Sequence, residues 1–265
     1  MNIVHPGAKV GENVEIGSFT TIADDVTIGD GSWIGSNVTI VEGTRIGKNC
    51  KIFPGAILGA MPQDLKFHGE STLLEIEDNV TIREYCTINK GTQANYETRI
   101  KENALLMAYV HVAHDCIIGR NCVLANNVTL AGHIEVGDFA ILGGLSAVHQ
   151  FVKIGEHSMI GGGSMVRKDV PPYVKAAREP LSYVGINSVG LRRRGFKKDQ
   201  INLIQDVYRI LFVLGNNTTQ ALELIESTIE PTKERDHILS FIRGADRGIM
   251  KGFRRQSMQV NGSLG

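Results

Sequence analysis

The first candidate catalytic residues lie in the segment LMAYVHVAHDCIIG, residues 106–119. There His111 and His114 lie three residues apart among aliphatic side chains, and Asp115 follows the second histidine. An imidazole titrates near neutral pH and can act as a general base toward a hydroxyl, and a neighbouring carboxylate can support it. The alternative is that both histidines are polar residues on a buried strand and have no catalytic role. The secondary structure that contains them decides between these two interpretations.

A period of six residues organises most of the chain. Steps of six from Val4 to Val166 give 28 positions, and 25 of them are Val, Ile or Leu; the exceptions are Asp64, Glu70 and Ala94. Small or β-branched residues form a second column four places after each aliphatic, and all four cysteines belong to it. An amphipathic helix needs apolar spacings of three and four, and a simple strand needs two. A strict six therefore predicts the hexapeptide repeat of a parallel β-helix, with the cysteines as buried small side chains.

Two polar segments interrupt the repeat without shifting its frame, residues 59–75 (GAMPQDLKFHGESTLLE) and residues 89–99 (NKGTQANYETR). Loops that leave a rigid scaffold and return in register are good candidates for ligand contact. We therefore expect a β-helix domain over residues 1–190 with two functional loops.

The chain changes character after the repeat. The segment KDVPPY follows Val166, and we expect Pro171 and Pro172 to end strand pairing there. Apolar residues from Ile201 to Leu211 follow helical spacing, and two more helices are expected over residues 218–229 and 232–243. The sequence thus predicts an α-helical domain over residues 191–265. This domain has 13 Lys and Arg against 8 Asp and Glu, a net charge of +5 that could receive an acidic partner.

Composition excludes several classes of protein. The formal net charge of the 265 residues is zero, so no global basic field argues for nucleic acid. The start MNIVHPGAKVGEN has neither the basic end nor the apolar core of a secretory signal, and no apolar run approaches the ~20 residues of a membrane helix. Four cysteines do not form a disulfide framework in such a chain. We expect a cytoplasmic protein without stable membrane insertion.

The repeat also aligns distant residues. Proteins of the hexapeptide-repeat family, which this pattern resembles, place three hexapeptides in each 18-residue coil. With that period, Gly132 and Gln150 lie one and two coils after His114 at the same position of the coil. His133 and His149 are each one residue away from this aligned set. Four of the eight histidines are thus expected along one edge of the β-helix, which favours a functional site over surface polar residues without a role.

Two chemistries suit this histidine patch. One imidazole can act as a general base, or three histidines can bind zinc and leave a position open for water. The spacing does not separate these alternatives. Nucleophilic catalysis is disfavoured, because no cysteine faces outward and no serine lies in a nucleophile elbow.

Several motifs now give a specific resemblance over essentially the whole chain. The segments HVAHDC, LANNVTLAGH, GGLSAVHQF, GGGSMVRKDVPPYV and GINSVGLRRRGF, with PQDLKFHGE in the first loop, resemble the bacterial UDP-N-acetylglucosamine O-acyltransferases that begin lipid A synthesis. That family consists of cytosolic homotrimers of left-handed β-helices with active sites between subunits. Its members move a 3-hydroxyacyl group from the phosphopantetheine of acyl carrier protein to the glucosamine 3-hydroxyl.

The resemblance implies catalytic roles for three residues. His114 would be the general base, Asp115 its electrostatic support, and the Gly132 N–H the donor to the tetrahedral oxyanion. A thioester donor is already activated, so the resemblance implies no metal and no cofactor beyond the carrier's phosphopantetheine.

The resemblance also implies a set of substrate contacts. These are Gln63, Asp64 and Lys66 on the first loop, His111, His133, His149 and Gln150 on the patch, and Asn187, Arg193 and Arg194 near the nucleotide. Guanidinium groups suit phosphate oxygens, whereas Arg192 is a candidate contact for the acidic carrier protein. Gly162 stands where the family gauges acyl length, although a structural role in the GGG corner explains this glycine almost as well. Val189 replaces an acid common in the family, so a nucleotide contact from that position is in doubt.

Three other functions stay open on these residues. A related acyltransferase would use a 3-amino UDP-sugar and form an amide, and the histidine patch suits either acceptor. A γ-class carbonic anhydrase would need three zinc-binding histidines and no large helical cap. A non-catalytic solenoid would serve only as an assembly scaffold.

Overall fold

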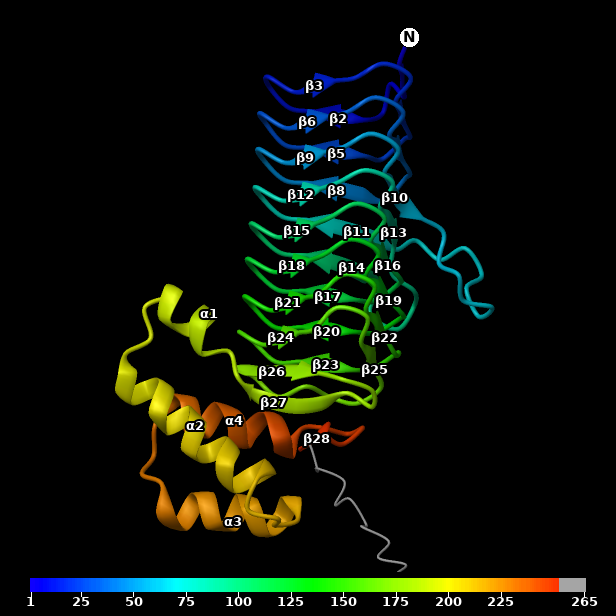
Figure 1. Cartoon of the computed structure of the whole chain (residues 1–265). Coiled ribbons are helices and arrows are strands. Elements are labelled where there is room, and N and C mark those ends of the chain that lie inside the picture. Colours follow the sequence, from blue (N-terminus) through cyan, green and yellow to red (C-terminus); the bar gives the residue numbers. More distant parts are fainter. Residues whose placement is uncertain (253–265) are drawn as a thin grey trace, which may run out of the picture.

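The computed structural model describes residues 1–252, and most of them wind into a prism with three parallel sheets as its faces (Figure 1). Sheet A contains β1 (Ile3–Val4), β4 (Thr21–Ile22), β7 (Thr39–Ile40), β10 (Ile57–Ala60), β13 (Thr87–Asn89), β16 (His111–Val112), β19 (Thr129–Leu130), β22 (Ala147–Val148) and β25 (Met165–Val166). Sheet B contains β2 (Lys9–Val10), β5 (Thr27–Ile28), β8 (Thr44–Ile46), β11 (Leu73–Ile76), β14 (Glu97–Ile100), β17 (Ile117–Ile118), β20 (Glu135–Val136) and β23 (Lys153–Ile154). Sheet C contains β3 (Glu15–Ile16), β6 (Trp33–Ile34), β9 (Lys51–Ile52), β12 (Thr81–Ile82), β15 (Leu105–Leu106), β18 (Val123–Leu124), β21 (Ile141–Leu142) and β24 (Met159–Ile160), followed by β26 (Val174–Ala177), β27 (Ser182–Ile186) and β28 (Lys251–Gly252).

The strands pair in the register that the period of six predicts. His111 on β16 pairs with Thr129 on β19, which in turn pairs with Ala147 on β22, so each coil advances by 18 residues. Both loops return in register, as the unshifted frame predicted: Leu58 pairs with Ile88 across the first loop, and Ile76 pairs with Ile100 across the second. The first loop leaves the prism from β10 and projects well away from it (Figure 1).

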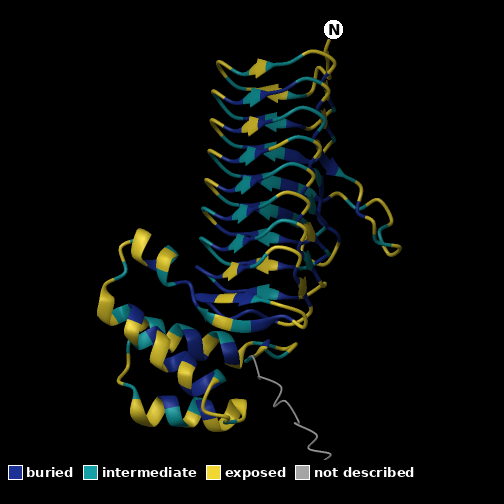
Figure 2. Ribbon diagram, in the orientation of Figure 1, coloured by how far each residue is buried: buried dark blue, intermediate teal, exposed yellow. Residues whose placement is uncertain are grey.

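The interior of the prism is a continuous aliphatic core. From Ile22 onward the repeat aliphatics are almost entirely buried, and the four cysteines lie among them as buried thiols (Figure 2). The N-terminal coil is the exception, with Ile3, Val4 and Val10 exposed. Because each coil is covered only by its neighbours, the first coil has no coil above it to bury these side chains.

Strand pairing continues beyond the prolines, so the expected stop at Pro171 and Pro172 is wrong. Val170 still bridges to Ile154, and β26 pairs in parallel with β24 before turning into the antiparallel partner β27. Proline lacks only its own N–H, and both prolines occupy the turn before β26 rather than the strand.

Four helices follow in the described part of the chain, α1 (Ser188–Arg193), α2 (Lys198–Phe212), α3 (Thr218–Thr228) and α4 (Lys233–Arg243). The three predicted helices correspond to α2, α3 and α4, whereas α1 was not expected and crosses the proposed boundary at residue 190. Residues 253–265, assigned to the helical domain from sequence, lie outside the described residues. No helix among residues 1–252 is both long enough and apolar enough to cross a membrane.

The helices are attached to the last coils by buried contacts. The Tyr208 hydroxyl on α2 donates to the Pro172 carbonyl at 2.6 Å, and Tyr208 is fully buried. The Tyr173 hydroxyl lies 2.8 Å from a Glu156 carboxylate oxygen and 2.9 Å from Nδ1 of His237 on α4. Burial resists ionisation of Glu156, but the hydrogen bond from His237 outweighs it and lowers the Glu156 pKa to about 2.

Candidate active site

His114 and Asp115 form a hydrogen-bonded pair at the corner that follows β16. Nδ1 of His114 lies 2.7 Å from Oδ2 of Asp115. The Asp115 side chain is fully buried, whereas the His114 side chain keeps 12% of its surface exposed. Asp115 adopts a left-handed backbone conformation with φ of 60°, which aspartate tolerates better than most residues. The corner thus buries the carboxylate and leaves part of the imidazole accessible.

The Asp115 carboxylate is held by the second loop. Its Oδ1 accepts hydrogen bonds from the backbone N–H groups of Thr92 and Asn95, at 3.0 and 3.2 Å, and Oδ2 accepts from the Thr92 hydroxyl at 2.6 Å. The Asp115 N–H donates in turn to the Thr98 hydroxyl at 2.9 Å. Burial alone would raise the Asp115 pKa, but the hydrogen bonds from His114 and Thr92 outweigh burial and lower it to about 2. Asp115 is therefore ionised at neutral pH.

The charge on Asp115 determines which His114 nitrogen can react. An ionised carboxylate only accepts hydrogen bonds, so Nδ1 of His114 must be the donor. The neutral imidazole then has its free lone pair on Nε2. This tautomer is the one that a general base needs.

Gly132 lies against the reactive side of His114. A Cβ atom at Gly132 would be 2.6 Å from Cε1 and 2.8 Å from Nε2 of His114, so only glycine leaves room for the ring. Within residues 1–252 the Gly132 N–H makes no hydrogen bond. On another corner, the equivalent N–H groups of Lys48 and Arg120 donate to aspartates of the next coil. The Gly132 N–H is thus a donor without a partner in the described part of the chain, one coil from His114.

His133 packs between the His114–Asp115 pair and the next coil. Its ring meets the His114 ring edge-on with centroids 5.0 Å apart, and stacks on Phe151 with centroids 4.5 Å apart. Burial lowers the His133 pKa, although the carboxylates of Asp115 and Asp64 act in the opposite direction.

The other predicted contacts within the patch are more exposed. Gln63 and Lys66 are exposed on the first loop, and His149, Gln150 and Gly162 are exposed on later coils. His111 is half-buried and its Nδ1 lies 2.8 Å from the Thr87 hydroxyl, so it is hydrogen-bonded along sheet A instead of to the His114–Asp115 pair. Burial lowers the pKa of His111.

The predicted nucleotide contacts do not join the patch within one chain. Asn187 is buried and caps α1, with Oδ1 accepting from the Gly190 N–H and Nδ2 donating to the His157 carbonyl. Arg193 is exposed near the end of α1, and Arg194 lies over the Phe139 ring, 5.2 Å from its centroid. Phe139 follows β20 of sheet B, whereas His114 follows β16 of sheet A. These residues therefore occupy a different corner of the prism.

A metal is the other chemistry that the patch suggested. His114, Asp115 and His133 each place one possible ligand atom within 4.8 Å of the others. However, the Asp115 oxygens already accept hydrogen bonds from Thr92 and Asn95, and Nδ1 of His114 faces Asp115. A zinc ion would have to break these contacts, so the donor set does not fit a three-ligand zinc site.

The sequence did not identify Thr92, Asn95 or Phe151. The 18-residue coil period would have found Phe151, because this residue follows His133 by one coil, but the second loop has no repeat that could place Thr92.

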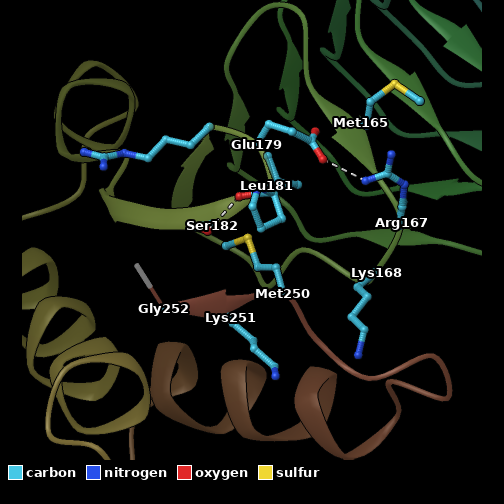
Figure 3. Close-up of a pocket in the computed structure, with 11 residues that line it drawn as sticks. Met165, Arg167, Lys168, Glu179, Leu181, Ser182, Met250, Lys251 and Gly252 are labelled. Atoms are coloured by element: carbon cyan, nitrogen blue, oxygen red, sulfur yellow. Dashed lines mark hydrogen bonds and ion pairs between the residues drawn. The ribbon is translucent and has the colours of Figure 1, made fainter. Parts of the chain in front are cut away.

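A separate cavity of about 790 Å³ lies at the C-terminal end of the prism. Met165, Leu181 and Met250 line it together with Arg167 and Lys168 (Figure 3). None of the predicted site residues lines it.

Comparisons with known proteins agree with this arrangement. Residues 25–60 and 97–132 match the bacterial transferase hexapeptide repeat, and residues 169–250 match domain 2 of UDP-N-acetylglucosamine O-acyltransferase. The chain is 46% identical over 250 residues to an acyl-(acyl-carrier-protein)–UDP-N-acetylglucosamine O-acyltransferase of Thiobacillus denitrificans, covering 94% of this chain and 97% of the relative. The corresponding protein of Aliarcobacter butzleri is 47% identical over 249 residues, with 93% and 95% covered.

A solved structure shows the same similarity in three dimensions. LpxA, a UDP-N-acetylglucosamine acyltransferase from Bacteroides fragilis, superimposes with a TM-score of 0.93 at 48% identity, covering 94% of this chain and 98% of that one. The fold is therefore a left-handed β-helix with a C-terminal helical region, as predicted. Identity of this extent over nearly the full length shows that the chain belongs to the UDP-N-acetylglucosamine O-acyltransferase family.

Proposed function

We propose that this protein transfers a 3-hydroxyacyl group from acyl carrier protein to the 3-hydroxyl of UDP-N-acetylglucosamine, the first step of lipid A synthesis. The observation that supports it most strongly is the His114–Asp115 pair, whose Nε2 lies beside Gly132, a residue with an N–H that is unpaired within residues 1–252. This arrangement on adjacent coils suits a base beside an oxyanion donor. The relatives' names supply the identity of both substrates.

The reaction follows from this geometry. Nε2 of His114 takes the proton of the sugar hydroxyl while its oxygen attacks the thioester carbonyl carbon. The Gly132 N–H donates to the resulting oxyanion, and the buried Asp115 carboxylate stabilises the imidazolium. Collapse of the tetrahedral intermediate breaks the C–S bond, and the imidazolium returns the proton to the departing thiolate. The thioester is already activated, so these steps use only groups of this chain and the carrier's phosphopantetheine.

The sugar nucleotide would be held by the first loop and the outer patch. We assign Gln63, Asp64 and Lys66 to the sugar and its phosphates, together with the patch residues His111, His133, His149 and Gln150. Gly162, exposed at the corner that follows β24 of sheet C, would border the acyl chain. Arg193 and Arg194 would bind the nucleotide phosphates, and Asn187 would support them by capping their helix.

These assignments require more than one chain. Arg194 and His114 occupy different corners of the same prism, so one substrate reaches both only if two chains pack side by side. We therefore propose a homotrimer whose sites lie between neighbouring subunits. The acidic carrier protein would approach the basic helical region, where Arg192 is exposed, and we place the reaction in the cytoplasm.

Product analysis tests the proposal and the acceptor together. The protein is incubated with 3-hydroxyacyl carrier proteins of several chain lengths and either UDP-N-acetylglucosamine or its 3-amino analogue. Mass spectrometry should show an O-acylated sugar nucleotide from the hydroxyl acceptor. Product from the amino acceptor alone would replace the proposal with an N-acyltransferase, a function that the relatives' names do not favour.

A further inference from the structure

The second loop connects the base of the first loop to the catalytic carboxylate. Asn89 donates from Nδ2 to the carbonyl oxygens of Ala60 and Met61, at 3.4 and 3.2 Å, where the first loop begins. Two residues later the Gly91 carbonyl accepts from the Thr72 hydroxyl at 2.6 Å, where the first loop ends. The next residue, Thr92, contacts Asp115. The second loop is therefore hydrogen-bonded to both the start and the end of the first loop before it reaches the Asp115 carboxylate.

Thr92 makes a double contact that backbone geometry alone does not require. Its N–H donates to Oδ1 of Asp115 and its hydroxyl donates to Oδ2, the same oxygen that faces Nδ1 of His114. Thr92 keeps only 7% of its surface exposed, so little water competes for this oxygen. Two donors on one buried oxygen share its negative charge, and each fixes the plane of the carboxylate.

We propose that Thr92 is a positioning residue that sets both the orientation and the basicity of the Asp115–His114 pair, an inference that rests on the proposed role of His114 as the general base. The Thr92 hydroxyl lies 2.6 Å from Oδ2 of Asp115, and Nδ1 of His114 lies 2.7 Å from the same atom. Without the Thr92 hydroxyl, Oδ2 of Asp115 interacts more strongly with the His114 imidazolium, and the carboxylate is less firmly oriented. The base would then stay protonated to higher pH and lie less well aligned with the acceptor hydroxyl.

Other charged groups near the His114–Asp115 pair also affect the titration of the His114 imidazole. Nε2 of His133, from the corner after β19, lies 3.8 Å from Oδ2 of Asp115. Asp64 of the first loop acts on His133. Neither contacts Thr92 through a hydrogen bond within residues 1–252, so a Thr92 substitution leaves both in place.

The test compares Thr92→Val with Thr92→Ser and Thr72→Val in the full-length protein. Valine keeps the shape of threonine and the Thr92 N–H, but removes the hydroxyl. We expect Thr92→Val to lower kcat about tenfold, the effect of one charge-assisted hydrogen bond, with the KM for UDP-N-acetylglucosamine within about twofold of wild type. The acid limb of its kcat/KM profile should move to higher pH. Thr92→Ser should keep wild-type values for both quantities.

Thr72→Val is the control for a purely structural role. It removes the other loop anchor without touching Asp115, so its acid limb should stay in place. If Thr72→Val reproduces the shift of Thr92→Val, or if Thr92→Val keeps the wild-type kcat and profile, the inference is wrong. Thr92→Ala replaces Thr92→Val if the latter does not fold.

NMR titration of the His114 imidazole separates this inference from the proposed function, because it needs no substrate. The imidazole should titrate at higher pH in Thr92→Val than in wild type. An active wild type without that difference overturns the role of Thr92 alone. A difference in a wild type that transfers no acyl group overturns the proposed function instead and supports the coupling of Thr92 to His114.

Discussion

Gly132→Ala should disable catalysis while sparing the fold. The new Cβ would lie 2.6 Å from Cε1 of His114, which is 0.8 Å short of the 3.4 Å at which ordinary contact begins. The neighbour is an aromatic ring whose Nδ1 is tied to Asp115 at 2.7 Å, so the ring cannot rotate away freely. It must retreat by most of an ångström from the position that faces the oxyanion donor.

The size of the effect follows from this displacement. A reacting group misplaced by about 1 Å can lower the rate about 100-fold, so we expect kcat of Gly132→Ala to fall by about two orders of magnitude. The KM for UDP-N-acetylglucosamine should change less than kcat, because the three atoms nearest to the new Cβ all belong to His114. Steady-state kinetics with acyl carrier protein substrate measures both quantities.

A matched glycine substitution provides the control. Gly244 follows α4, far from the patch in the chain, and a Cβ atom there would come no closer than 3.5 Å to the atoms around it. Gly244→Ala should therefore keep wild-type kcat, and thermal unfolding should show that both variants are folded. A Gly132→Ala enzyme that keeps kcat within about threefold of wild type would refute the close approach that we infer.

Three further predictions concern charge, docking and assembly. Because folding lowers the Asp115 pKa from 3.8 to about 2, its ionised form adds about 2 kcal/mol of stability above pH 4 that is lost as the pH falls toward 2. Denaturation curves of Asp115→Asn should lack this part of the acid dependence; an unchanged dependence would contradict it. Tyr173→Phe removes the hydroxyl bond to Glu156 and should lower the free energy of unfolding in urea by about 1–2 kcal/mol with kcat unchanged. Unchanged stability would show that the Tyr173 hydroxyl, which also lies 2.9 Å from Nδ1 of His237 on α4, does not hold the helices. Random mixed trimers of His114→Ala and Arg194→Ala should regain about a quarter of wild-type activity, since a quarter of the shared sites keep both residues. Activity no greater than that of the two parents would contradict shared sites.

The fold was predictable because one physical constraint repeats along the chain. Every coil must place an aliphatic side chain against the next coil, so the period of six survives from Val4 to Val166 and sets the register. The helices α2 to α4 were visible for a similar reason, since each has a face of regularly spaced apolar residues. The six-residue α1 is too short to show such a face.

The site was predictable only where the repeat could place it. His114, Gly132 and His133 lie on coils of fixed length, so their neighbourhood follows from residue numbers alone. Thr92 and Asn95 lie in a loop that leaves the repeat, and nothing in the period indicates that this loop folds back onto Asp115. The proline turn at residues 171–172 was misjudged because its residue types do not show whether the chain turns before a strand or within one.

The central claim is that Nε2 of His114 removes the acceptor proton, and kcat/KM of His114→Ala tests it most directly. General-base catalysis contributes about 10²- to 10⁴-fold, so the variant should lose at least 100-fold in acyl transfer from 3-hydroxyacyl carrier protein to UDP-N-acetylglucosamine. His5→Ala is the matched control, since His5 lies 3.3 Å from Asp24 in an exposed pair near the N-terminus. It should keep wild-type kcat/KM. A His114→Ala enzyme within about tenfold of wild type would contradict the account.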